Sequence, residues 1–290
     1  MRNSSKFWVL ATALGLGLIT LPVAWAYIPP SGFILKSILG KRASVKGLRI
    51  RSTVNAMEGS RVTEISFKQV MVYDAQSRTL KSHAYDLNGH ELYSIERKLP
   101  EVFTAQNARA GEALPTVSSL LFDSHLESTA AVLRAAGIPI RTEAELLQMK
   151  DEDERRASET QSLARLRNQV AWVMGPGTKD LLWPQLWVEK DGFLPLRMIM
   201  KGEEGPTDLR FEAYRFQGAY AYPGAITAWK ASKLDTDARQ GVLREELIEL
   251  STTPDPKELR ASTSHGYTEA GNAADGATRD LIRRYYSIVR

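Results

Sequence analysis

The sequence contains no cysteine, which excludes disulfide bonds, thiolate metal sites and cysteine nucleophiles. Histidine is also scarce. The four that occur, His83, His90, His125 and His265, form no HExxH or HxH pattern of the kind that predicts a zinc site. A GxSxG nucleophile elbow is absent, and the stretch "MGPGTKD" (174–180) lacks the spacing of a phosphate-binding loop. We therefore expect no catalytic residues, no metal site and no cofactor, and a protein that is not an enzyme.

The charge balance gives no support for a nucleic-acid partner. The formal net charge is +4. It falls to +2 without residues 1–26, because that segment contains Arg2 and Lys6 and no acidic residue. Nucleic-acid-binding domains are usually far more basic. With 43% hydrophobic and 25% charged residues, the sequence has the composition of a globular domain with a substantial core.

Residues 1–26 have the pattern of a secretory signal peptide. Arg2 and Lys6 precede the apolar run "FWVLATALGLGLITLPVAWA", which ends in an Ala-Trp-Ala cleavage pattern at residues 24–26. The alternative is a retained membrane anchor, since the run is long enough to span a bilayer. The helix-weakening glycines and proline inside it favour cleavage, and no cysteine follows it to be acylated. We expect export to the periplasm of a bacterial envelope.

Hydrophobic periodicity predicts an order of helix, strands, helices and strands. We expect a helix over 31–41, strands over 45–54 and 64–74, and a hairpin over 79–97 with an Asn88-Gly89 turn. One helix is expected over 116–137, and a further helix starts at a Thr142–Glu145 capping box and continues through the charged run "KDEDERRASE" (150–159). Later strands are expected over 166–175, 184–200, 208–216 and 225–234, while 241–250 fits a strand or a helix. This order predicts an α+β fold with an antiparallel sheet.

The last part of the chain, 252–290, is expected to be a loop-rich tail that ends in a helix. Residues 252–276 are rich in Pro, Gly, Ser, Thr and Asn, and only "PKELR" (256–260) indicates a helical turn. In "TRDLIRRYYSIVR" (278–290), apolar side chains recur at helical spacing with arginines between them. We expect this helix to dock on the protein. The alternative is a helix that lies on a membrane surface, which would give transient membrane contact.

The segment "PQLWVEKDGFLPLRMIM" (184–200) predicts a β-hairpin with a two-residue Asp-Gly turn. If residue 190 pairs with residue 193, Val188 pairs with Pro195 and Trp187 pairs with Leu196. Apolar side chains then occupy both faces, whereas an ordinary antiparallel hairpin has one polar face. One face is expected to pack beneath the helices or line a groove, and the other to pack on a neighbouring element.

Aromatic and apolar side chains are concentrated on the later strands, more than a monomer usually leaves in contact with water. Each of them alone fits an ordinary core. Together they predict a concave sheet whose inner face holds an acyl chain, with methionine as an adaptable lining. The candidate ligand-binding residues of this hydrophobic groove are Trp172, Trp187, Leu194, Leu196, Met198 and Met200.

The same segment carries a resemblance to a known family. The pattern P-x-L-W-hydrophobic-acidic-K-x-x-F-x-P is met by residues 184–195, and a tyrosine-rich strand with Pro223 follows it. In these features the sequence resembles the superfamily of the outer-membrane lipoprotein carrier and its receptor (LolA and LolB), which includes periplasmic sensors of the RseB type. The "RP" dipeptide and the basic residue that anchor the carrier's lid have no counterpart, and Arg49 and Arg51 are not matched to that role.

The resemblance implies an incomplete, half-open antiparallel β-barrel around a hydrophobic cavity, covered by helices that act as a lid. It implies a domain over 27–251 between the signal peptide (1–26) and the tail (252–290). Two functions follow. The first is a periplasmic lipid- or lipoprotein-binding protein, such as a lipoprotein carrier or sorting factor, whose partners are acyl chains. The second is an envelope sensor or scaffold that uses the same fold to bind a protein partner.

Overall fold

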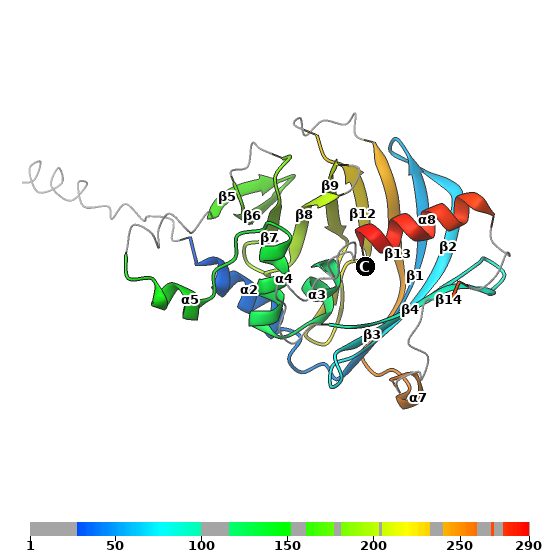
Figure 1. The fold of residues 1–290 in the computed structure, drawn as a ribbon, viewed down its shortest axis with the longest axis horizontal. Coiled ribbons are helices and arrows are strands. Elements are labelled where there is room, and N and C mark those ends of the chain that lie inside the picture. Colours follow the sequence, from blue (N-terminus) through cyan, green and yellow to red (C-terminus); the bar gives the residue numbers. More distant parts are fainter. Residues whose placement is uncertain are drawn as a thin grey trace, which may run out of the picture.

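A sheet of twelve antiparallel strands forms the frame of the molecule (Figure 1). The structure is a computed structural model that describes residues 28–99, 116–151, 161–176, 181–202, 205–232, 240–259, 268–269 and 275–289. The signal-peptide prediction and most of the charged run at 150–159 lie outside these residues. The strands of the sheet are β1 (Gly47–Glu58), β2 (Arg61–Asp74), β3 (Thr79–Tyr85), β4 (Glu91–Lys98), β5 (Gln161–Leu166), β6 (Gln169–Met174), β7 (Gln185–Glu189), β8 (Pro195–Gly202), β9 (Gly205–Glu212), β12 (Ala225–Lys230), β13 (Gly241–Ser251) and β14 (Thr268–Glu269).

The strand order across the sheet is β14-β4-β3-β2-β1-β13-β12-β9-β8-β7-β6-β5. The strands at its two ends differ, so the sheet is open over the described residues. A separate two-stranded sheet is formed by β10 (Arg215–Gln217) and β11 (Tyr220–Tyr222). The helices are α2 (Ser31–Gly40), α3 (Thr116–Phe122), α4 (Leu126–Ala135), α5 (Glu143–Gln148), α7 (Pro256–Leu259) and α8 (Gly276–Ile288). The α+β class with an open antiparallel sheet covered by helices is confirmed.

Element boundaries depart from the sequence predictions in several places. The single helix expected over 116–137 is two helices, because the Asp123 carboxylate accepts hydrogen bonds from the backbone N–H groups of Ser124 and His125 and ends α3 there. Helix α5 begins at the predicted capping box but ends at Gln148, before the charged run. The strand expected over 208–216 is broken at Ala213, which has a left-handed φ of 53°. Residues 241–251 form a strand, which settles the alternative left open.

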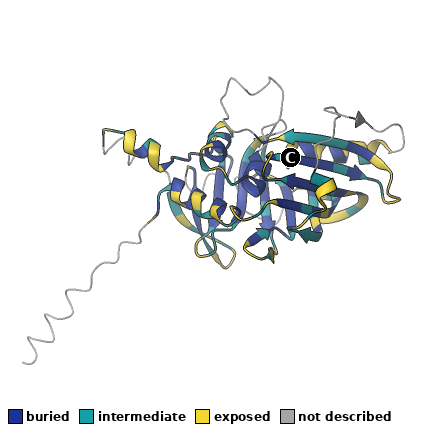
Figure 2. Cartoon of the chain, turned by 90° about the horizontal axis from the view of Figure 1, so that it is seen from below, coloured by how far each residue is buried: buried dark blue, intermediate teal, exposed yellow. Residues whose placement is uncertain are grey.

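The hydrophobic core consists of two clusters on opposite faces of the sheet. The larger one combines inward-pointing strand residues with residues of α2, α3, α4 and α8. We call the sheet face that carries it the inner face. The smaller one lies on the opposite, outer face and contains Ala171, Val173, Leu181, Trp187, Leu196 and Ile199. Figure 2 shows buried residues running along the strands and the helices packed on them.

A β-bulge in the hairpin of β7 and β8 decides which side chains reach each face. Val188 pairs with Pro195 as predicted, but Trp187 pairs with Arg197 and not with Leu196. Leu196 and Arg197 together oppose Trp187, as in a bulge that places two residues against one. The extra residue turns Met198 towards the inner face and leaves Leu196 on the outer face. The prediction of one face shared by Trp187, Leu196, Met198 and Met200 was therefore wrong.

The turn of this hairpin is also longer than the predicted two-residue Asp-Gly turn. The Phe193 N–H donates to the Glu189 carbonyl at 3.0 Å, and Phe193 has a left-handed φ of 51°. The Glu189 carboxylate accepts from the backbone N–H groups of Asp191 and Gly192. These bonds satisfy the turn locally and make a tighter turn unnecessary.

Candidate functional site

The inner face of the sheet is almost entirely apolar and is covered by helices. Side chains from ten strands, β1–β4, β6–β9, β12 and β13, contribute to it. Figure 1 shows α3 and α4 in front of the strands on one side and α8 in front of β13, β1 and β2 on the other. The strand residues of this face include Ile50, Val54, Phe67, Met71, Leu80, Ala84, Trp172, Met174, Leu186, Val188, Met198, Leu209, Phe211, Ile226, Ala228 and Leu243.

The first cover consists of α2, α3 and α4, which are too short to be stable alone. Isolated helices of fewer than about 12 residues are marginal in water. These three have ten, seven and ten residues. Phe33 of α2 packs edge-on against Phe193 of the β7–β8 turn, with ring centroids 6.0 Å apart. The Tyr220 hydroxyl of β11 donates to the Leu121 carbonyl of α3 at 3.1 Å. The position of this cover therefore depends on its contacts with the sheet.

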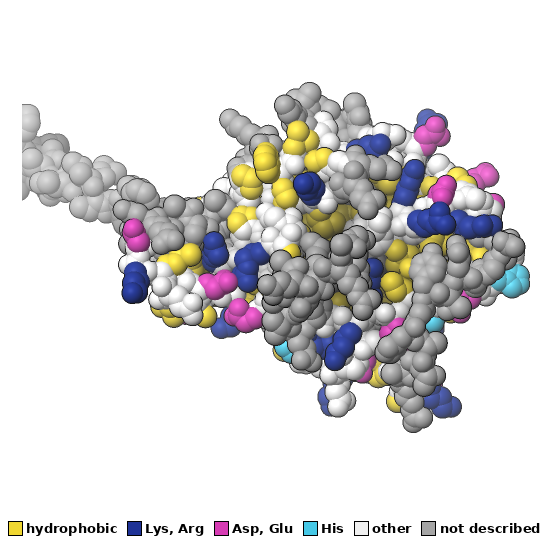
Figure 3. Space-filling view, in the orientation of Figure 1, with side chains coloured by type: hydrophobic (Ala, Val, Ile, Leu, Met, Phe, Trp, Pro, Cys, Tyr) yellow, Lys and Arg dark blue, Asp and Glu magenta, His cyan; other side chains and the backbone are white. Residues whose placement is uncertain are grey.

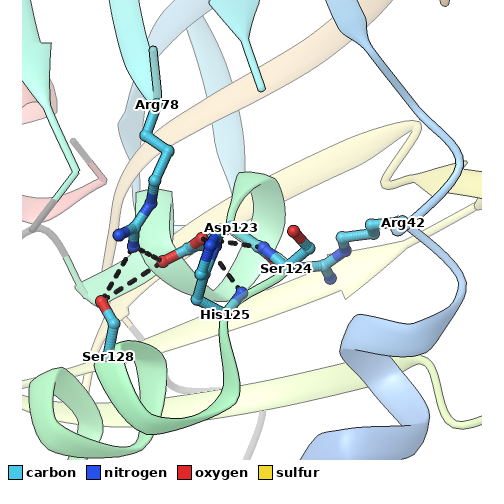
Figure 4. Close-up of polar contacts among 6 residues, drawn as sticks. All are labelled: Arg42, Arg78, Asp123, Ser124, His125 and Ser128. Carbon is cyan, nitrogen blue, oxygen red and sulfur yellow. Dashed lines mark hydrogen bonds and ion pairs between the residues drawn. The ribbon is translucent and has the colours of Figure 1, made fainter. Parts of the chain in front are cut away.

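A buried ion pair attaches α3 and α4 to the rim of the sheet (Figure 4). Asp123 lies between the two helices and has no exposed surface. Its Oδ2 atom accepts a hydrogen bond from Arg78 Nη2 at 2.5 Å and one from Ser128 Oγ at 3.4 Å. Its Oδ1 atom accepts from the backbone N–H groups of Ser124 and His125 at 2.8 and 3.1 Å. We call Asp123, Arg78 and Ser128 the latch.

The backbone of Arg78 is strained. Arg78 lies in the turn between β2 and β3 with a left-handed φ of 56°, which few non-glycine residues adopt. Such conformations cost about 1–3 kcal/mol and persist where surrounding contacts fix them. Here the Arg78 carbonyl accepts from the Leu99 N–H at 2.8 Å while its guanidinium binds Asp123.

A second buried arginine binds the end of α3. Arg42 follows α2, and its Nη1 atom donates to the Leu120 carbonyl and, at 3.3 Å, to the Asp123 carbonyl (Figure 4). A cation at this position satisfies carbonyls that a helix C-terminus leaves unpaired. Burial lowers the pKa of Arg42, and the nearby Tyr220 and Asp123 oppose that shift. An arginine remains protonated at neutral pH even so.

The second cover is α8, whose apolar side packs against the inner face. Leu281, Ile282, Tyr285 and Tyr286 of this helix are buried. The Tyr285 ring packs edge-on against Phe67 of β2. The centroid of the Tyr286 ring lies 4.5 Å from the centroid of the Tyr93 ring of β4. The arginines of the helix are exposed, and Figure 3 shows basic side chains over its position. The prediction that this segment docks on the protein is confirmed.

The predicted groove residues lie in three different settings. Trp172 and Met198 are buried in the inner-face cluster, and Met200 is partly buried against it. Trp187 and Leu196 are buried on the outer face, where the Arg197 guanidinium stacks 5.4 Å from the Trp187 ring centre. Leu194 is half-buried next to the turn. Trp187 and Leu196 thus do not face the inner side, and whether the other residues bind a ligand stays a prediction.

The residues that hold the covers were not recognised in the sequence. Arg49 and Arg51, the two arginines considered for the lid, instead form partly exposed pairs with Glu249. Arg42 and Arg78 belong to no recognisable motif, and they meet Asp123 only in the folded chain. The one signal that was present is the polar pair Asp123-Ser124, which interrupts an apolar helical pattern.

The described residues contain no cluster of histidine, aspartate and glutamate that would bind a metal ion. Within the same residues, no helix is long and apolar enough to cross a membrane. A cavity of about 540 Å³ is lined by residues that include Lys46, Gln217 and Pro254, and none of the predicted groove residues contributes to it.

The fold and the site define an α+β protein with an open antiparallel sheet whose inner face is covered by helices. Several solved structures are similar to this chain at low sequence identity. A LolA superfamily protein from Nitrosomonas europaea matches 81% of this chain and 99% of its own, with 10% identity and a TM-score of 0.44. An outer membrane lipoprotein-sorting protein domain from Vibrio parahaemolyticus matches 88% of this chain and 97% of its own, with 7% identity and a TM-score of 0.42.

A MucA/MucB complex from Pseudomonas aeruginosa is also similar, over 75% of this chain and 94% of the matched chain, with 9% identity and a TM-score of 0.23. No protein-family model matches the sequence. No curated protein matches it either.

Proposed function

We propose that this chain is a non-enzymatic periplasmic protein that binds acyl chains, either of free lipids or of lipoproteins, on the inner face of its sheet. The observation that carries the proposal is that, among the described residues, an apolar face contributed by ten strands is covered mainly by short helices. Moving short helices away exposes an apolar surface without breaking any strand pairing. Burial of an acyl chain recovers about 0.8 kcal/mol per methylene, so partial enclosure is sufficient.

The latch indicates where the cover is held closed. Asp123 connects the α3–α4 junction to Arg78 at the sheet rim, and Arg42 holds the end of α3. In the proposal, opening this lid breaks these polar contacts and separates the apolar side chains of α3 and α4 from the inner face. In the proposal, Trp172, Met198 and Met200 line the acyl site beneath this cover.

The test is native mass spectrometry of the protein purified from the envelope without detergent, together with titration of a fluorescent fatty acid. We expect a co-purified lipid or saturable probe binding. Absence of both would refute the proposal. The matched variants are Met198→Ala and Ile199→Ala, since these neighbours are both fully buried but face opposite sides of β8. Only the inner-face variant should change the affinity for the probe.

A second candidate function, an envelope sensor or scaffold that binds a protein partner, is favoured by exposed apolar side chains away from the inner face. Phe216 of β10 is 63% exposed and Ile248 of β13 is 51% exposed. The Arg215 side chain, adjacent to Phe216, donates to the Ile248 carbonyl at 3.3 Å, so the two lie in one region. This function predicts a partner recovered by cross-linking and a purified protein without lipid. A Phe216→Ser variant should then lose the partner.

A further inference from the structure

Four polar side chains interrupt the apolar inner face between β13 and β3. They are Ser52 of β1, Gln69 of β2, Ser82 of β3 and Glu245 of β13, and each is about 1% exposed. Ser52 and Gln69 are paired across β1 and β2, and Ser52 Oγ donates to Gln69 Oε1 at 3.3 Å. Gln69 Nε2 donates to Ser82 Oγ at 2.8 Å. We call these four residues the polar strip. A buried polar group is costly unless it is hydrogen-bonded, so a core built only for stability has no need of it.

Helix α8 contacts the polar strip with two tyrosine hydroxyls. The Tyr285 hydroxyl lies 2.6 Å from Gln69 Oε1 and 2.8 Å from Glu245 Oε2. The Tyr286 hydroxyl lies 2.8 Å from Ser82 Oγ. Glu245 Oε1 accepts from the Tyr222 hydroxyl of β11 at 3.2 Å. The helix thus supplies an apolar body and hydroxyl groups to an apolar face with a polar centre, which is the combination that an amphiphile would supply.

We propose that the inner face between β13 and β3 is a binding groove for an amphiphile with a hydrogen-bond-donating headgroup, and that α8 is its displaceable internal occupant. The proposal rests on the proposed function and adds to its acyl site, on β6 and β8, a site for the headgroup on the strands from β13 to β3. Binding pockets of this type combine an apolar lining with a few placed polar groups that fix orientation.

The chemistry of the strip selects the headgroup. A phenol has one proton, so Tyr285 donates to only one of its two neighbouring acceptors, Gln69 Oε1 or Glu245 Oε2, at a time. A headgroup with two donors, such as the glycerol of a monoacylglycerol, donates to both acceptors at once. An acyl methyl ester has the same chain and no donor, and would leave Glu245 without the bond that Tyr285 supplies. The groove should therefore prefer the glyceride.

The experiment follows α8 and the bound lipid separately in the full chain. Because the sequence has no cysteine, Ser287→Cys on the exposed side of α8 gives a single position for a nitroxide spin label. Label mobility is measured by electron paramagnetic resonance as 1-monooleoylglycerol or methyl oleate is added. Native mass spectrometry counts bound lipid in the same samples. We expect monooleoylglycerol to bind at least about tenfold more tightly than methyl oleate and to mobilise the label.

A matched pair of tyrosine variants tests whether α8 competes with the lipid. Tyr285→Phe keeps the ring against Phe67 and removes the hydroxyl from the strip. It should raise the released population of α8, and the apparent affinity for monooleoylglycerol, about tenfold or more. The control, Tyr214→Phe, removes a hydroxyl that donates to the Pro195 carbonyl at 2.5 Å, away from α8, and should change neither quantity.

The outcomes separate this inference from the proposed function. If both lipids bind equally, the polar strip does not select the headgroup. If monooleoylglycerol binds while the label stays immobile, α8 is not displaced. Either result overturns the inference and leaves acyl binding, the proposed function, intact. If the label is mobile in Tyr285→Phe and no lipid binds to any variant, the groove is open but takes no acyl chain, and the proposed function itself is overturned.

Discussion

Asp123 is a single carboxyl group on which two covering helices depend. It has no exposed surface, and its partner Arg78 is 3% exposed. A buried charge that loses its partner is left uncompensated, which is more costly than the pair is stabilising. The latch therefore adds little to the overall free energy of unfolding, but removing one of its partners should displace α3 and α4.

Replacing Asp123 with Asn should lower the free energy of unfolding by about 3 kcal/mol, because Arg78 stays buried without its counter-charge. Urea denaturation followed by circular dichroism measures the loss. Glu127→Gln is the matched control, since Glu127 is an exposed carboxylate one turn further along the same region and should change stability by less than about 0.5 kcal/mol. Equal losses in both variants would contradict a role for the latch.

Helix α2 contains two glycines with different surroundings, Gly32 in its first turn and Gly40 at its last residue. A Cβ atom at Gly32 would lie 2.4 Å from the Arg141 carbonyl oxygen, whereas a Cβ atom at Gly40 would meet nothing within 4 Å. The close approach at Gly32 is reinforced by Ser31, whose Oγ accepts from the Arg141 N–H at 2.9 Å. This contact joins α2 to the segment that follows α4.

Gly32→Ala should therefore destabilise the protein by about 1–3 kcal/mol, since backbone atoms must move to admit the methyl group. Gly40→Ala, in the same helix, should be neutral or slightly stabilising because alanine has the higher helix propensity. Thermal unfolding of the two variants side by side measures the difference. A similar melting temperature for both would show that α2 is free to shift away from residue 141.

The N-terminus of α8 should respond to acid. The Asp275 carboxylate accepts a hydrogen bond from the Thr278 N–H at 2.6 Å, and this bond lowers the pKa of Asp275 below its ordinary value of 3.8. A group with a lowered pKa in the folded state stabilises that state above its unfolded pKa, and the contribution is lost as the pH falls through the folded value. We expect α8 to loosen below about pH 4 for this reason.

The spin label at residue 287 reports this change. Asp275→Asn keeps a capping oxygen without a titrating group, so the acid-dependent step should become smaller in that variant. Asp86 is a useful contrast, because hydrogen bonds from His90 also lower its pKa but it lies in the β3–β4 turn. An Asp86→Asn variant that abolished the step would place its origin outside α8.

At the scale of elements, the sequence was most informative where a local pattern alone decides the structure. Strand alternation located β1 and β2, and the Thr142 and Glu145 spacing located the start of α5. It was least informative where one residue acts through distant partners. The bulge at Leu196 and Arg197 is accompanied by a bidentate pair between Arg197 and Asp208, at 2.8 and 2.7 Å, and no period-two pattern encodes either feature.

The candidate site was predictable in composition and not in arrangement. An excess of apolar residues on the later strands correctly indicated that both faces of the hairpin are covered. Which residue lies on which face depended on the bulge, and the attachment of the covers depended on Arg42 and Arg78 meeting Asp123 across the fold. The position of α8 on the inner face likewise follows from tyrosine hydroxyls that match a polar strip on four different strands.

For the whole molecule, the proposed function predicts that a bound acyl chain stabilises the folded state. A ligand present at about 100 times its dissociation constant adds about 2.7 kcal/mol to the free energy of unfolding. Urea denaturation with and without monooleoylglycerol, below the concentration at which it forms aggregates, measures the gain. Glycerol at the same concentration is the control because it lacks the acyl chain. Equal stability with both would count against acyl binding.

The place of β13 has a kinetic consequence. Strands β1–β4 form one sequential meander and strands β5–β9 with β12 form another, and β13 joins them by pairing with β1 on one side and β12 on the other. Arg49 near the beginning of the described chain is thus aligned with Ser251 near its end. Pairings between residues so far apart in sequence form slowly. A chain synthesised from its N-terminus therefore holds two unjoined groups of strands until its last long strand, β13, is available to pair with both.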